Sequence, residues 1–184
     1  MLSGPQPLAK ERLESSLLFA IHAGRAENIE ALFEAGASPN FSDKLGHTPL
    51  IKASKNGDAP CVRALLHGGA LPDQTNKYAF TALHLACRRG HHQVVRALCE
   101  AGASTDLIDE SPGHKGEKSL LMWASASGHH QCVQDLLKGG ATIDQSNKQG
   151  LNALSFAMHF SNNQCVHHRR KEYQRLNKSA LFHR

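Results

Sequence analysis

Hydrophobic residues recur along this chain in columns spaced 33 residues apart, with one interval of 38. One column is leucine, and a second column three residues further on is alanine. Residues at positions i and i+3 share one face of a helix, so each unit is predicted to begin with a helix whose inner face is apolar and partly small. The leucines are Leu17, Leu50, Leu83, Leu121 and Leu154, and the alanines are Ala20, Ala53, Ala86, Ala124 and Ala157.

Glycines divide each unit into two helices. The first helix is predicted to end at Gly24, Gly57, Gly90 and Gly128, where the chain must adopt a positive φ. A second apolar run follows, and it ends at Gly36, Gly69, Gly102 and Gly140. A short polar stretch rich in turn-forming residues, which we call a finger, leads to the next unit. Thr48 and Pro49 form an expected N-cap and first helical position.

These motifs resemble the signature of the ankyrin-repeat family. The resemblance is carried by Thr48-Pro49-Leu50, by Thr81-Ala82-Leu83-His84, by Gly-His at 90–91 and 128–129, and by residues 100–104. It runs from about residue 15 to residue 166 and recurs in several copies, as expected of stacked units. The resemblance implies an all-α repeat solenoid of antiparallel helix pairs with β-hairpin fingers, which binds proteins and has no catalytic activity. It also implies a structural role for His84.

The columns also set the boundaries of the units. The predicted order is an N-terminal segment or cap (1–14), four repeats (15–47, 48–80, 81–118 and 119–151), a partial fifth repeat (152–168) and a basic tail (169–184). The finger at 110–118 is five residues longer than its counterparts and is either a recognition element or a tolerated surface insertion. Arg169 and Arg170 replace the core leucines of the fifth repeat, which indicates either an atypical cap or a shortened end.

The net charge of +5 is concentrated in the tail. From His167 onward the chain has six lysines and arginines and one acid, so residues 1–166 are neutral overall. An alternative to protein binding is therefore that the chain binds a polyanion, either nucleic acid or phosphoinositide, through the finger lysines and the tail.

Within the neutral body, one face is expected to combine cations with apolar side chains. The fingers contribute Lys44, Lys77, Lys115, Lys118 and Lys148, and the ends of the first helices contribute Lys55, Asn56, Arg88 and Arg89. The interleaved side chains are Leu45, His47, Tyr78, Phe80 and Leu151 on the fingers and Phe160 at a helix end. Such a face suits an acidic segment of a partner protein with apolar anchors, bound by a monomeric scaffold or adaptor. The alternative is that the finger lysines only increase solubility.

No catalytic motif, cofactor site or metal site is predicted. The histidine pairs at 91–92 and 129–130 lie at turns, where adjacent side chains point apart, and we interpret them as turn caps. The chain has five cysteines, no apolar leader and no stretch long enough to span a membrane, so we expect a cytosolic or nuclear protein with reduced thiols. Cys61, Cys132 and Cys165 share one column in separate units and are not expected to form disulfides, and Cys99 is expected to be a small buried hydrophobic residue.

Overall fold

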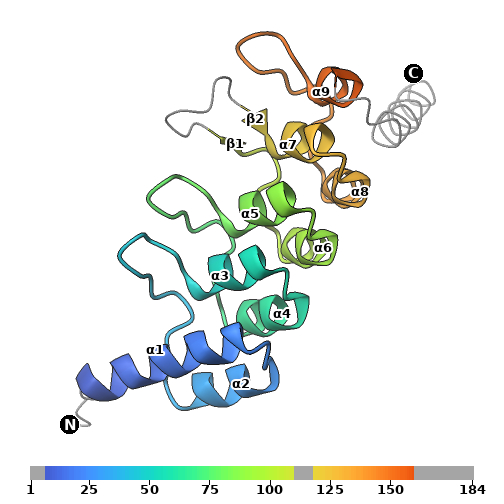
Figure 1. Cartoon of the computed structure of the whole chain (residues 1–184). Helices are drawn as coiled ribbons and strands as arrows, with labels where there is room; N and C mark the ends of the chain where they lie inside the picture. Colours follow the sequence, from blue (N-terminus) through green and yellow to red (C-terminus); the bar gives the residue numbers. More distant parts are fainter. Residues whose placement is uncertain (1–6, 110–117, 160–184) are drawn as a thin grey trace, which may run out of the picture.

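The computed structural model of the chain describes residues 7–109 and 118–159. Helix pairs stack in a row, so that first helices form one layer and second helices form another (Figure 1). The first helices are α1 (Pro7–His22), α3 (Pro49–Asn56), α5 (Ala82–Arg89), α7 (Leu120–Ala126) and α9 (Ala153–His159). The second helices are α2 (Glu27–Glu34), α4 (Ala59–His67), α6 (His92–Glu100) and α8 (His130–Lys138). This arrangement confirms the predicted all-α solenoid.

The helices begin and end where the sequence signals predict. Thr48 accepts a hydrogen bond from the Ile51 amide at 3.2 Å, and Pro49 occupies the first helical turn. Thr81 and His84 form a reciprocal capping box, in which the Thr81 amide donates to His84 Nδ1 at 3.2 Å. At the other end of α3, Gly57 adopts φ +82°, a left-handed conformation that is strained for other residues.

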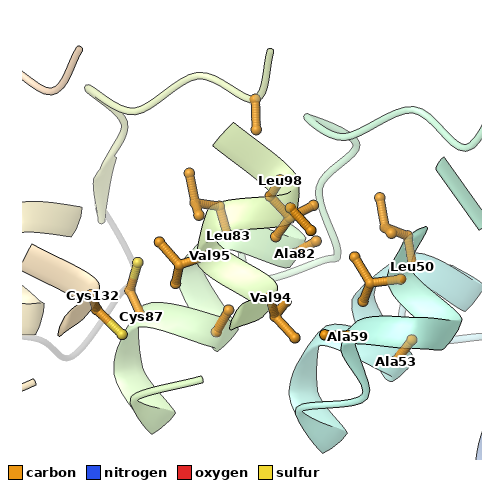
Figure 2. Close-up of a cluster of buried hydrophobic side chains, with 14 of the residues drawn as sticks. Leu50, Ala53, Ala59, Ala82, Leu83, Cys87, Val94, Val95, Leu98 and Cys132 are labelled. Atoms are coloured by element: carbon orange, nitrogen blue, oxygen red, sulfur yellow. The ribbon is translucent and has the colours of Figure 1, made fainter. Parts of the chain in front are cut away.

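The core lies between the two helix layers and continues from unit to unit. Figure 2 shows its central part, in which Leu83 and Leu98 are fully buried. The alanine column is buried throughout, which lets neighbouring first helices pack closely. Leu154 and Leu32, near the two ends of the described stack, are only half-buried because fewer neighbouring units cover them. Burial therefore depends on the adjacent repeats, as expected of a solenoid.

Side chains spaced 33 residues apart join each unit to the next. Asn40 Oδ1 accepts a hydrogen bond from the Leu71 amide at 2.8 Å. Asp73 accepts from the amide and hydroxyl of Ser104 at 2.9 and 2.7 Å. Asp106 accepts from the amide and hydroxyl of Thr142 at 2.7 and 2.6 Å. We call these three contacts the junction bonds, and they hold successive units in one register.

Asp43, Asn76 and Asn147 close three of the fingers in the same way. In each finger the side-chain Oδ1 accepts hydrogen bonds from the amides two and four residues later, at 2.9–3.0 Å. The longer finger instead begins and ends in a two-stranded antiparallel sheet of β1 (Ile108–Asp109) and β2 (Lys118–Ser119). Among the described residues, a strand pair of this kind forms only at that finger, and the fourth finger adds a single bridge between Ser146 and Asn152.

Ala79 is expected to be a point of strain in the second finger. It has φ +60°, whereas glycines occupy the same position at Gly46 and Gly150. Because a left-handed conformation costs an L-residue about 1 kcal/mol, Ala79→Gly should raise the free energy of unfolding by roughly 0.5–1 kcal/mol, measured by urea denaturation. Gly150→Ala is the matched control, because the added Cβ meets no atom within 4 Å and tests strain alone. An Ala79→Gly variant no more stable than the wild type would contradict this interpretation.

Candidate partner-binding face

The tips of the first two fingers present apolar side chains next to lysines, and the fourth finger has a lysine at its tip and an exposed leucine at its base. Leu45, Tyr78 and Leu151 are 45%, 51% and 39% exposed. Lys44, Lys77 and Lys148 are also exposed, and each directly follows the Asp or Asn that closes its finger. The exposure predicted for these six residues is confirmed, and their role in binding stays a prediction. The first, second and fourth fingers extend from the first-helix layer on the same side of the stack (Figure 1).

The first two finger tips are in direct contact. The Lys77 amide donates a hydrogen bond to the Leu45 carbonyl at 3.0 Å. Gly46 lies so close to the next finger that a Cβ on it would be 3.1 Å from Asn76 Cα. The two tips therefore form one continuous edge rather than independent loops.

Phe80 does not lie at a finger tip. The prediction that it is an exposed apolar anchor is wrong, because Phe80 is only 8% exposed. Its amide closes the finger by bonding Asn76 Oδ1, and the chain there returns to α5. The Phe80 ring lies 5.7 Å from the His84 ring between centroids. His47, at the matching position of the first finger, is half-buried, and its Nδ1 is 3.4 Å from Asp43 Oδ2.

A row of alternating aromatic and cationic side chains crosses units two to five. The Arg88 guanidinium carbon lies 5.4 Å from the Phe80 ring centroid and 5.1 Å from the Trp123 centroid. Lys118 Nζ lies 4.4 Å from the Trp123 centroid and 5.1 Å from the Phe156 centroid. We call these five residues the cation–aromatic row. Its members come from the second finger, α5, α7, β2 and α9.

The sequence prediction included Arg88, Lys118 and Phe80 but not their stacking. Trp123 and Phe156 share one column of the repeat, which the register of the ankyrin signature places in the groove between helices, so that packing, or else partial exposure, is expected of Trp123. The structure gives both features, since Trp123 is half-buried and stacks on two cations. The row could have been found from the sequence by two signals, the aromatic residues in the column of Trp123 and Phe156 and the cation Arg88 at the end of the first helix one unit earlier.

The cations of the first helices differ in whether an acidic side chain lies next to them. Lys55 and Arg89 are exposed at the ends of α3 and α5, together with Asn56. In the described part of the chain, neither cation forms an ion pair. Lys52, which was not among the predicted site residues, lies 2.8 Å from Asp43 Oδ2.

The Lys52 contact is the main feature that changes the electrostatics of the first finger. Burial alone would raise the pKa of Asp43. The Lys52 ammonium and the amides of His47 and Leu45 outweigh burial and hold that pKa well below its ordinary value. The finger is therefore closed by a carboxylate that stays ionised at neutral pH. Lys115 and Phe160 lie outside the described residues, so no position is assigned to them.

The layer of second helices has a different charge pattern. Glu30, Glu34 and Glu100 are exposed there. Asp135 is 3% exposed and occupies a column that is alanine in the three preceding units. Its Oδ1 accepts hydrogen bonds from Nε and Nη2 of Arg96 in the preceding unit, both at 3.2 Å. Asp135 therefore joins α6 to α8, and the sequence signal for it was an acid in an alanine column.

The histidines at the turns pack between units instead of capping their own helices. His91 and His129 precede α6 and α8, and neither side chain caps its helix. Each imidazole lies against a glycine of the preceding unit, because a Cβ on Gly57 or Gly90 would be 2.6 or 2.7 Å from its Nδ1. His91 and His129 therefore do not cap the helices that follow them, whereas the His91 imidazole forms a hydrogen bond with the backbone of Lys55 in the last turn of α3. Burial lowers the pKa of His91, and the nearby charge of Arg89 acts in the same direction.

No reactive or metal-binding cluster accompanies the face in the part of the chain that the structure describes. No group of three or more His, Cys, Asp or Glu residues there is placed to hold a metal ion. Burial raises the pKa of the Cys61 thiol to about 12 and that of Cys99 to about 11, so neither is a reactive thiolate at neutral pH. Cys99, predicted to be a small buried hydrophobic residue, is half-buried and packs against the core, and Cys165 lies outside the described residues. None of the described helices combines the length and the apolar character that crossing a membrane requires.

The repeats match family models over most of the chain. Residues 17–109 match a model described as ankyrin repeats in three copies, and residues 117–148 match a single ankyrin repeat. No curated protein is significantly similar to the chain in sequence. The chain therefore belongs to the ankyrin-repeat family, whose members generally mediate protein–protein interactions and are typically non-enzymatic. The fifth unit lies beyond the matched residues.

Proposed function

We propose that this chain is a non-enzymatic scaffold or adaptor that binds a partner protein on the face formed by the fingers and the first helices. One observation carries the proposal. Three fingers each combine an exposed lysine at the tip with an exposed apolar side chain, which lies at the tip in the first two and at the base in the fourth, and they extend from one side of the stack. A stacked array of this kind offers an extended surface rather than an enclosed pocket.

The partner segment that suits this face is acidic and carries apolar anchors. Lys55 and Arg89 form no ion pair within the described residues, and the tips add further positive charge. Buried aromatic and aliphatic contacts supply most of the affinity in protein interfaces, whereas charges accelerate association and select the partner. Tyr78 would therefore act as an anchor and the lysines would attract acidic residues around it.

The proposal is tested by affinity capture followed by titration calorimetry with the captured partner. We expect Tyr78→Ala to weaken binding by more than tenfold while the melting temperature changes little, because the side chain is half exposed. Charge reversal of Lys44, Lys77 and Lys148 should slow association. The matched control reverses Glu30 and Glu34 on the opposite layer and should leave binding unchanged. Full affinity in both finger variants would reject this face as the binding site.

Salt dependence separates a protein partner from a polyanion. A 20-base-pair DNA duplex and vesicles containing a phosphoinositide serve as probes beside the captured partner. Six to ten phosphate contacts would reduce the affinity by about 10³-fold or more between 50 and 200 mM salt. Binding of either probe with that salt dependence, together with unchanged binding by Tyr78→Ala, would favour the polyanion over the protein.

A further inference from the structure

The cation–aromatic row differs from the finger tips in how firmly its cations are held. Lys44 and Lys77 are exposed at the ends of flexible side chains. Arg88 and Lys118 are half-buried, and each lies within 5.4 Å of the centroids of two aromatic rings. A side chain that is already restricted loses less conformational entropy when it binds a ligand. The row is therefore better prepared for binding than the tips are.

The donors of the two stacked cations have no acceptor among the described residues. Within that part of the chain, neither side chain takes part in an ion pair of 4.0 Å or less. Stacking on an aromatic face leaves the edge of a guanidinium available for a planar, bidentate carboxylate contact. Since partly desolvated cations gain more from an opposite charge than fully hydrated ones do, an incoming acid is favoured here.

The distance between the two cations of the row also indicates how the acidic residues of a bound peptide are spaced. Arg88 and Lys118 both lie within 5.1 Å of the Trp123 centroid, so they are separated by less than twice that distance. Arg88 also contacts Phe80 before α5, whereas Lys118 also contacts Phe156 on α9. Side chains at i and i+2 of an extended peptide lie on one side, about 7 Å apart. Two acids with one residue between them therefore match the two cations.

We propose that the cation–aromatic row is a carboxylate-binding centre for an extended peptide segment with acidic residues at i and i+2. Arg88 binds one carboxylate through two N–H donors, Lys118 binds the other, and the half-buried Trp123 contacts the peptide between them. This inference rests on the proposed function, because it assigns the main anchor of the same face to the row that crosses units two to five.

The probe is a phage-displayed library of random dodecapeptides, selected on the immobilised full chain. A fluorescein-labelled copy of an enriched peptide is then titrated by anisotropy against the wild type and two double variants. Arg88→Gln with Lys118→Gln removes two cations from the row, and Lys44→Gln with Lys77→Gln removes two from the tips. We expect enrichment of acidic residues at i and i+2, at least tenfold weaker binding by the row variant and less than threefold weaker binding by the tip variant.

Two further measurements distinguish recognition from a structural effect. Replacing the two peptide acids by glutamines should weaken binding to the wild type but barely change binding to the row variant. Arg88→Lys, which keeps the charge but loses the bidentate contact, should weaken binding severalfold with an unchanged melting temperature. If Arg88→Lys binds like the wild type, the bidentate contact is wrong.

Other results would overturn the inference in recognisable ways. Equal losses in the row and tip variants would show that the face binds without a centre in the row, so the proposed function would stand and this inference would fail. Peptides enriched without an acidic pattern, and bound normally by both variants, would reject the face as well. A phosphoserine version of the peptide that binds more than tenfold tighter than the acidic one would assign the row to phosphopeptides.

Discussion

Replacing Leu83 with alanine is expected to lower the free energy of unfolding by about 3 kcal/mol. Leu83 is fully buried in the central part of the core, with units packed on both sides (Figure 2). Truncation removes its apolar contacts and leaves a cavity that the rigid helix pairs fill only in part. Urea denaturation followed by circular dichroism at 222 nm measures the loss.

The same substitution at Leu154 is the control. Leu154 occupies the same column but is only half-buried near the end of the described stack. Its truncation should cost about 1 kcal/mol, because less apolar surface leaves water when this unit packs. Equal losses at the two positions would show that burial in this solenoid does not depend on adjacent repeats.

Gly68→Ala is expected to be the most disruptive addition of a single methyl group. A Cβ on Gly68 would lie 2.1 Å from Cε2 of Phe33, a ring carried by the preceding unit. The ring must move or the helices must separate. We therefore expect the free energy of unfolding to fall by roughly 2 kcal/mol, measured by the same urea denaturation.

The repeat itself suggests a compensating substitution. The columns that contain Phe33 and Gly68 continue as Leu66 and Ala101 in the next unit. Phe33→Leu combined with Gly68→Ala copies that leucine–alanine pair and should recover most of the lost stability. The double-mutant cycle should give a coupling of about 1–2 kcal/mol. Additive losses would contradict a direct contact between the two positions.

The helices and their ends could be predicted from the sequence because their signals are local. The spacing of leucine and alanine defines one helix face, and a glycine or a Thr-Pro pair marks each boundary. The structure confirms these positions at Thr48 and Gly57. The strand pairing of the fingers was predicted less well, since Asp43 and Asn76 close their fingers through side-chain hydrogen bonds.

The burial of individual finger residues could not be predicted, because it depends on neighbours that the repeat does not specify. His47, Phe80 and Leu151 share one column, yet they are half-buried, buried and exposed, respectively. Phe80 is buried in part because the Arg88 guanidinium packs over its ring. A residue's column in the repeat predicts where its backbone lies, but it does not predict whether a neighbouring side chain buries that residue.

The cation–aromatic row was not predicted from the sequence for a related reason. Its contacts join residues from four units, with no local motif to mark them. Trp123 is 35 residues from Arg88 in the sequence, and only the stacking of units brings the two together. The same holds for His91, which follows a turn in the chain but packs on Gly57 of the previous unit.

The junction bonds have a consequence for how this molecule could diversify. Asp106 binds Thr142 as Asp73 binds Ser104, although the chain between the first pair is five residues longer. The anchoring of one unit on the next is thus independent of the length of the intervening loop. Loops could be exchanged between these anchors as cassettes, so that evolution or a protein engineer can graft a new specificity onto an unchanged scaffold.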